Sequence, residues 1–156
     1  MTTIAYVGGI MAADTLMSRG REITTGAKKI FATGHYLIGF SGSYGVIPAL
    51  LEFLKDGEGA TDGDATLLHK VWSDKPDFAE EFCVLLVNRH GTVFYGGDTP
   101  PVIVARPFEA IGTGAQFAIG SMAYGAGAKR AVKIAAGLDA FTGGDVISLS
   151  LKDIGR

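Results

Sequence analysis

The chain has 156 residues, of which 47 % are hydrophobic and 19 % are charged, and its formal net charge is −2. This length corresponds to one domain over residues 1–156, and the hydrophobic share is large enough for a buried core, which excludes a disordered chain. No apolar run approaches the ~18 residues of a membrane-spanning helix, and a single cysteine, Cys83, excludes a disulfide scaffold.

Glycine makes up 23 of the 156 residues, about twice its usual share of ~7 %. Low charge combined with a mean hydropathy of +0.28 predicts that part of the surface is buried against other subunits. The largest basic cluster, Lys129, Arg130 and Lys133, lacks interleaved aromatic residues, so nucleic acid is not an expected partner. The N-terminal residues show no signal-peptide pattern, which predicts a cytoplasmic protein.

The first forty residues read as two β-hairpins separated by a loop. Glycines at positions 8 and 9 offer a two-residue turn between the first two strands. A polar stretch predicts the loop, and a second hairpin turns around Thr33-Gly34-His35. In chain order these elements are strands Thr2–Tyr6 and Ile10–Thr15, loop Ser18–Lys28, and strands Lys29–Ala32 and Tyr36–Ser41.

The rest of the chain alternates helices and strands. Apolar residues at helical spacing predict a helix after the second hairpin, with Pro48 harmless in its first turn. The predicted elements are helix Val46–Lys55, surface loop Asp56–Asp64, helix Ala65–Trp72, strands Phe82–Asn88 and Thr92–Tyr95, an extended piece at 100–107, helices Ala115–Tyr124 and Ala128–Leu138, and strand Asp145–Leu151. This order favours a layered α+β domain in which sheets are sandwiched between helices.

Three features accompany the N-terminal threonine. Removal of Met1 before a small second residue would leave Thr2 with a hydroxyl and a free α-amine, which together can act as nucleophile and base. Asp14 ends an apolar strand, and a lysine pair opens another strand. Gly39 lies in a strand where it could expose a backbone N–H.

The order of these segments resembles the N-terminal half of proteasome β-subunits, and among them the bacterial HslV-type peptidase. The segments are Thr-Thr-Ile at 2–4, Ala-Ala-Asp at 12–14, Lys-Lys-Ile at 28–30 and Gly-Phe-Ser-Gly at 39–42. Residues 110–114 resemble the family's Gly-Ser-Gly segment, and residues 139–144 its Asp-x-x-Ser-Gly-Gly turn. The resemblance covers about residues 2–54 and 108–151, whereas 55–107 agrees only in element order. It implies a four-layer αββα sandwich of the N-terminal-nucleophile type.

The resemblance also implies a role for each matching residue. Thr2 is the nucleophile, its α-amine takes the proton, and the Gly39 N–H binds the oxyanion. Lys29 lies beside the Thr2 hydroxyl and is held by Asp14. The residues implied to orient the amine and the attacking water are Thr113, Asp139 and Thr142, although the family usually has serine where this chain has its two threonines. A mostly apolar substrate pocket is expected from Met17, Ala27, Phe31 and Ser41.

The sequence therefore predicts a threonine peptidase that hydrolyses polypeptides as a homo-oligomeric ring, with an ATPase ring as the partner that the resemblance implies. No cofactor or metal is expected, because His35, His69 and His90 lack the spacing of metal ligands. Lys28 remains the alternative to Lys29. Two other readings also stay open: a non-catalytic or unprocessed ring subunit in which Thr2 keeps an amide nitrogen, and an amidase that acts on a small amide.

Overall fold

The computed structural model describes residues 2–56, 72–78 and 81–156. Its elements are β1 Thr3–Val7, β2 Ile10–Asp14, β3 Met17–Arg19, β4 Glu22–Thr24, β5 Ile30–Ala32, β6 Tyr36–Gly42, η1 Tyr44–Val46, α1 Ile47–Asp56, β7 Phe82–Asn88, β8 Val93–Gly97, β9 Val102–Ile103, β10 Phe108–Gly112, α3 Ala115–Ala123, α4 Ala128–Ala136, β11 Val146–Ser150 and η3 Leu151–Asp153.

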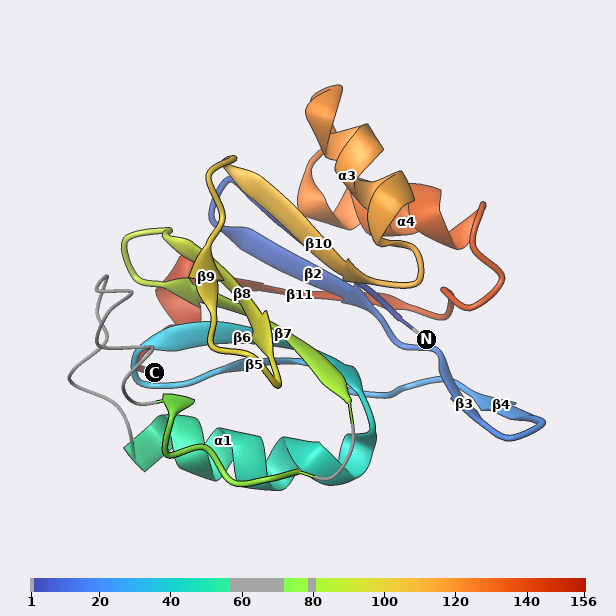
Figure 1. Ribbon diagram of the computed structural model, residues 1–156. Helices are drawn as coiled ribbons and strands as arrows, with labels where there is room; N and C mark the ends of the chain where they lie inside the picture. The colour runs from blue at the N-terminus through green and yellow to red at the C-terminus, as the bar shows by residue number, and fades with distance from the viewer. Residues whose placement is uncertain (1, 57–71, 79–80) are drawn as a thin grey trace.

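These elements form four layers (Figure 1). Helices α3 and α4 cover one face of a four-stranded sheet in the order β10-β1-β2-β11. The other face of that sheet packs on a five-stranded sheet in the order β5-β6-β7-β8-β9, and α1 covers the outside of the second sheet. All strand pairs in both sheets are antiparallel. The predicted α+β sandwich of αββα type is confirmed.

Strand alternation explains the layers, because successive side chains of a strand point to opposite faces. In β1, Ile4 and Tyr6 belong to the core between the sheets, whereas Ala5 belongs to the core under α3 and α4. The helix-side core consists largely of alanine, which lets the helices approach the sheet closely. A third core fills the space between the second sheet and α1, including Leu50 and Leu54 of the helix.

Most predicted elements are present, with shifts at their ends. Gly8 and Gly9 have φ of 60° and 82°, as the predicted two-residue turn requires. The helix after the second hairpin begins at Ile47, following the short η1. Strands β7, β8 and β11 and helices α3 and α4 each begin and end within two residues of the ends predicted from sequence. The predicted loop 56–64 and helix 65–72 lie outside the described residues, except for Asp56 in α1 and the buried Trp72.

Two sequence predictions were wrong. The stretch predicted as a loop at 18–28 contains most of a hairpin, β3 and β4, which protrudes from the layers in Figure 1. Its strands have three residues each and β4 is exposed throughout, so no alternation of buried residues marks them. Strand β10 was not predicted as a strand, yet it pairs with β1 from Thr3↔Gly112 to Val7↔Phe108.

No helix among the described residues is long and apolar enough to cross a membrane.

Candidate active site

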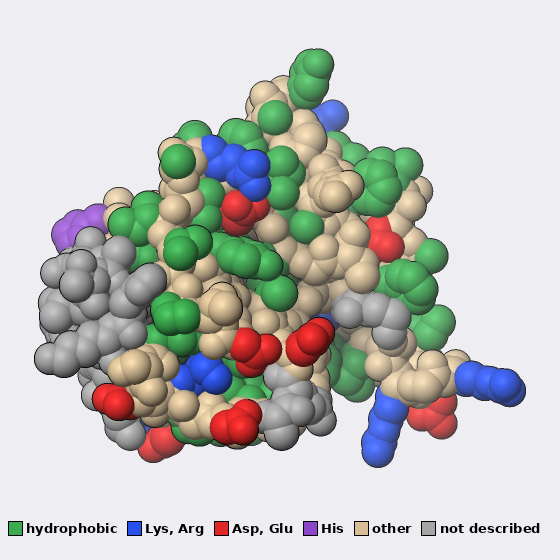
Figure 2. Space-filling view, in the orientation of Figure 1, with side chains coloured by type: hydrophobic (Ala, Val, Ile, Leu, Met, Phe, Trp, Pro, Cys, Tyr) green, Lys and Arg blue, Asp and Glu red, His purple; other side chains and the backbone are tan. Residues whose placement is uncertain are grey.

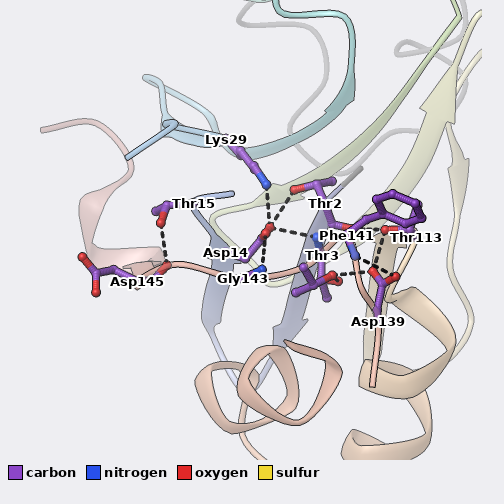
Figure 3. Close-up of polar contacts among 11 residues, drawn as sticks. Thr2, Thr3, Asp14, Thr15, Lys29, Thr113, Asp139, Phe141, Gly143 and Asp145 are labelled. Atoms are coloured by element: carbon purple, nitrogen blue, oxygen red, sulfur yellow. Dashed lines mark hydrogen bonds and ion pairs between the residues drawn. The ribbon is translucent and has the colours of Figure 1, made fainter. Parts of the chain in front are cut away.

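Asp14 is the centre of a buried cluster at the start of β1 (Figure 3). It ends β2 and has no exposed surface. Its Oδ1 accepts hydrogen bonds from Lys29 Nζ at 2.6 Å, Thr2 Oγ1 at 2.8 Å and the Thr3 N–H at 2.9 Å. Its Oδ2 accepts one from the Gly143 N–H at 3.0 Å. Four donors therefore hold the carboxylate in one position.

Lys29 precedes β5 and is 2 % exposed, so its ammonium group is an internal charge. Burial lowers the pKa of Lys29, and the hydrogen bond and charge of Asp14 oppose this shift. A lysine with a lowered pKa exchanges its proton more readily near neutral pH than an exposed one. Lys28, the alternative named from sequence, is exposed, and its Nζ lies 5.1 Å from the centroid of the Phe31 ring. Only Lys29 of the two contacts Asp14.

Thr2 lies immediately before β1 and is 2 % exposed. Its backbone is held from the other side by the β10–α3 turn, where the Gly114 N–H donates to the Thr2 carbonyl at 3.5 Å. Gly112 has φ of +97°, and a Cβ at this position would collide with the Thr2 carbonyl and side chain. Glycine at 112 is therefore required for the close approach that positions Thr2.

A second cluster is built around Asp139, after α4. Its Oδ2 accepts hydrogen bonds from Thr113 Oγ1 and Thr142 Oγ1, both at 2.6 Å, and its Oδ1 accepts the Phe141 N–H at 3.2 Å. Partial burial raises the pKa of Asp139, but these hydrogen bonds outweigh it and hold the pKa below its usual value. Thr113 Oγ1 also lies 3.4 Å from the Thr2 carbonyl oxygen, so this cluster borders the first.

Thr3 joins the two clusters. Its N–H donates to Asp14, and its Oγ1 lies 2.6 Å from Thr142 Oγ1. Because the Thr142 hydroxyl donates its proton to Asp139, Thr3 is the donor in the threonine pair. Thr3 and Gly143 were not among the sequence candidates. The signals were present, since Thr3 lies beside the candidate nucleophile and Gly143 belongs to the Thr-Gly-Gly turn.

Gly39 lies in a strand as predicted, but its expected role as the oxyanion donor was wrong. Gly39 lies in the middle of β6, paired with Ile30 of β5 and Leu85 of β7. The next residue, Phe40, donates its N–H to the Lys29 carbonyl on the β5 side, so the Gly39 N–H points toward β7 and is used in the sheet. A Cβ on Gly39 would lie 2.7 Å from Ile4 Cγ2. Gly39 therefore lets the two sheets approach each other and offers no N–H to a substrate.

Three of the four predicted substrate-binding residues come together. Met17, Ala27 and Phe31 line one surface pocket of about 430 Å³, here called the Phe31 pocket, whose full lining is Met17, Thr25, Gly26, Ala27, Lys28, Phe31, Tyr44, Ile47 and Pro48. A second pocket of about 540 Å³, the Gly42 pocket, shares Met17 and Tyr44 with it and is lined by Met17, Ser18, Arg19, Gly42, Ser43, Tyr44 and Gly45. The prediction for Ser41 does not fit this arrangement, because Ser41 lines a separate pocket with Cys83 and Asp98. Its side chain alternates with that of Phe40 and faces away from the Phe31 pocket.

The Thr2–Asp14–Lys29 cluster can perform proton-transfer chemistry on a hydroxyl. The Thr2 hydroxyl donates to a carboxylate that also holds an ammonium group, so charge developing on Thr2 Oγ1 has a cation on the same carboxylate oxygen. Among residues 2–56, 72–78 and 81–156, no group of three His, Cys, Asp or Glu side chains is arranged to hold a metal ion.

This αββα fold is similar to that of solved HslV-type structures. Eukaryotic HslV from Trypanosoma brucei has a TM-score of 0.76 and 22 % identity to this chain, and the match covers 96 % of this chain and 99 % of that one. Thiobacillus denitrificans BPH in complex with epoxomicin has a TM-score of 0.73 at 21 % identity, covering 96 % of this chain and 98 % of that one. No protein-family model and no curated protein matches the chain.

Proposed function

We propose that the protein is a threonine-type peptidase that hydrolyses peptide bonds with Thr2 as nucleophile after removal of Met1. The observation that carries the proposal is the buried cluster in which the Thr2 hydroxyl and the Lys29 ammonium bind the same oxygen of Asp14. The likeness of the whole chain to HslV supports it, because the cluster lies at the N-terminal end of the same fold.

In the proposed reaction, Thr2 Oγ1 attacks the peptide carbonyl carbon and its proton passes to the freed α-amine. With a reference pKa of about 7.7–8.0, an α-amine is a suitable base near neutral pH. The C–N bond then breaks, the amine of the leaving peptide receives the proton, and an ester to Thr2 remains. Water activated by the α-amine hydrolyses the ester and restores the Thr2 hydroxyl. Lys29, held by Asp14, stabilises negative charge on Thr2 Oγ1.

Gly42 takes the place of Gly39 as the oxyanion donor in this proposal. N–H groups of alternate strand residues point the same way, so the Gly42 N–H points to the same side as that of Phe40, which donates to Lys29. At Gly42 the neighbouring strand β5 has not yet begun, and Gly42 lines a surface pocket together with Met17. Its φ is +146°, and a Cβ would meet the Glu81 carbonyl at 2.9 Å, so a side chain is excluded here.

The Asp139 cluster has a positioning role in the proposal. Asp139, Thr113 and Thr142 lie on the side of Thr2 where its carbonyl is held, and Thr3 links them to Asp14. They would orient the α-amine and the attacking water. The methyl groups that the two threonines add over serine are accommodated, since Thr113 and Thr142 both donate hydrogen bonds to Asp139 at 2.6 Å.

We also propose that the protein acts as a homo-oligomeric ring, with an ATPase ring as its partner. Large apolar side chains are exposed on the α3–α4 layer, including Tyr124 at 98 % and Leu138 at 62 %, and on β9, where Val102 is 53 % exposed. Figure 2 shows green side chains over this helical end of the molecule. Subunit contacts would cover such surfaces. Light scattering tests this part, and a monomer would contradict it.

The central test combines intact mass with peptide turnover. Mass spectrometry first establishes that Met1 is removed. Processed wild type is then compared with Thr2→Ala on short fluorogenic peptides, with Thr99→Ala as a matched control at an exposed threonine. We expect at least a thousandfold loss for Thr2→Ala and an unchanged rate for Thr99→Ala. The mass of the protein after incubation with epoxomicin, the compound bound to Thiobacillus denitrificans BPH, gives a second readout. Equal turnover by Thr2→Ala, or none by processed wild type, would refute the mechanism.

The amidase reading predicts a different outcome of the same assay. A stand-alone amidase would hydrolyse a small amide as a monomer or dimer, and Thr2→Ala would abolish this activity while longer peptides remained uncleaved. An unprocessed or non-catalytic subunit would retain Met1 in the intact mass.

A further inference from the structure

The hairpin of β3 and β4 extends from the sandwich and belongs to none of its cores. It forms a two-stranded sheet of its own, and Figure 1 shows it protruding beside the layers. None of the three cores includes a residue of the hairpin, and Ile23 in β4 is 68 % exposed. An isolated hairpin of two strands is at best marginally stable in water. A surface outside this protomer would therefore stabilise it.

The tip of the hairpin carries two exposed arginines. Arg19 ends β3, and Arg21 lies in the turn that follows. Glu22 is exposed and pairs with Arg19 across the hairpin, so it offsets only part of this positive charge. Neither arginine forms an ion pair within the part of the chain that the structure describes. Figure 2 shows blue side chains standing out at the hairpin, away from the body of the molecule.

A second exposed surface, here called the β8 patch, has the complementary character. It consists of Glu81, Cys83, Tyr95, Asp98 and Val102. Both acids are exposed, and they line a pocket of about 330 Å³ together with the cysteine. Tyr95 Oη lies 3.4 Å from Cys83 Sγ, and Val102 of β9 is paired with Tyr95, so its side chain lies on the same face. Tyr95 is 40 % exposed and Val102 is 53 % exposed.

The hairpin and the β8 patch match in charge and in apolar character. The hairpin offers two arginines beside an isoleucine, and the patch offers two acids beside exposed apolar side chains. Figure 2 shows acidic side chains beside hydrophobic ones near β8 and β9. Among residues 2–56, 72–78 and 81–156, no ion pair joins these two surfaces within one protomer. A second copy of the chain can bring them together.

We propose that the β3–β4 hairpin of one protomer docks on the β8 patch of the next copy of this chain. The two arginines then pair with the two acids, and Ile23 is covered by the apolar side chains of the patch. Because the contact joins two different surfaces, it is a head-to-tail contact, which closes into a ring when the rotation between copies permits. The inference rests on the ring assembly of the proposed function and deepens it by naming both sides of the contact.

Charge reversal tests the pairing, with light scattering as the measure of assembly mass. The hairpin variant carries Arg19→Glu and Arg21→Glu, the patch variant carries Glu81→Arg and Asp98→Arg, and the swap variant carries all four substitutions. The first two variants place like charges across the contact, which opposes association, whereas the swap variant restores opposite charges. We expect the protein concentration at which half of the chains are assembled to rise at least a hundredfold in the hairpin and patch variants. In the swap variant it should return to within tenfold of wild type.

Lys55→Glu combined with Lys152→Glu is the matched control. It reverses two exposed positive charges that belong to neither surface. Its assembly should equal that of wild type, and circular dichroism checks that every variant is folded. Assembly that persists in the hairpin and patch variants overturns the inference. A swap variant that stays dissociated, or a control that dissociates to the same extent, also overturns it.

The single cysteine of the chain permits a second test that leaves every charge in place. Ile23→Cys puts a thiol on the hairpin, and Cys83 already lies in the patch. A short bismaleimide reagent should join the introduced thiol of one protomer to Cys83 of the next. We expect a ladder of products heavier than a dimer, in which mass spectrometry finds the hairpin peptide linked to the Cys83 peptide. Adding Cys83→Ser should abolish this link. Its absence from an assembled sample overturns the docking.

The outcomes separate the inference from the proposed function. A wild type that scatters light as a monomer overturns the ring and, with it, the docking of the hairpin. An assembled wild type that is insensitive to the charge reversals and gives no link to Cys83 overturns the docking alone.

Discussion

Replacing Lys29 with methionine isolates the internal ion pair that organises the site. The substitution keeps the length of the side chain and removes its charge. Lys29 is 2 % exposed and Asp14 is fully buried, so the variant leaves a carboxylate without its counter-charge inside the protein. Three donors remain on that carboxylate, from Thr2, Thr3 and Gly143.

The expected cost follows from these contacts. Removing one partner of a buried ion pair typically destabilises a protein by about 3–5 kcal/mol. The three remaining hydrogen bonds place Lys29→Met at the lower end, about 3 kcal/mol. For a chain of this length, about 2–4 °C per kcal/mol predicts a fall in Tm of about 6–12 °C. Adding Asp14→Asn removes the uncompensated charge, so the double variant should be more stable than the sum of the single effects by at least ~1 kcal/mol.

Urea unfolding at a fixed protein concentration measures these differences, because subunit association would otherwise shift the midpoint. Lys28→Met is the matched control, since the neighbouring lysine is exposed, and it should change stability by less than ~1 kcal/mol. The reasoning is refuted if Lys29→Met and Lys28→Met have equal effects. Strict additivity of Asp14→Asn and Lys29→Met would also contradict it.

Three further predictions concern other parts of the molecule. The pKa of Asp139 is lowered in the folded state, so the unfolded chain binds more protons in acid. The contribution of Asp139 to stability is therefore present above its usual pKa and is lost as pH falls through the pKa of the folded state. We expect the Tm of Asp139→Asn to fall less steeply with decreasing pH than that of wild type. Gly112→Ala places a Cβ against the Thr2 backbone at a φ of +97°, and we expect it to reduce peptide turnover at least a hundredfold. Gly120→Ala is the control, because a Cβ on this residue of α3 meets open space. It should leave turnover unchanged and stabilise the fold by about 0.5–1 kcal/mol. Gly39→Ala should destabilise by about 1–3 kcal/mol in chemical unfolding through its contact with Ile4, and a value near zero would contradict the close approach of the sheets.

Local patterns were sufficient to find much of the candidate site. Thr2, Asp14 and Lys29 each stand at the end of a strand that alternation or a hairpin turn makes visible in sequence, and two antiparallel hairpins bring such ends together. The structure brings together Thr113, Asp139 and Thr142, the three residues named from the resemblance, through two hydrogen bonds. Their catalytic roles stay predictions.

The features that the sequence did not reveal depend on contacts between distant residues. Strand β10 contains the buried Glu109, which is 8 % exposed and whose Oε1 lies 2.6 Å from Arg106 Nη2. Because this charged residue stands among apolar ones, the sequence of β10 does not show the alternation of polar and apolar residues that marks a half-buried strand. The direction of the Gly39 N–H depends on which residue of β6 first pairs with β5, and a shift of one residue reverses it.

The pairing of β1 distinguishes two adjacent threonines whose side chains are identical. Thr3 is held opposite Gly112 of β10, and Ile4 opposite Ala13 of β2. A slip of one residue would bring Thr3 to the position of Thr2, but it would also turn Ile4 from the core between the sheets toward the alanine-lined helix side. The packing of Ile4 and Tyr6 further along the strand thus decides which threonine donates its hydroxyl to Asp14. Substitutions at Ile4 or Tyr6 can therefore change the chemistry of the site without touching it.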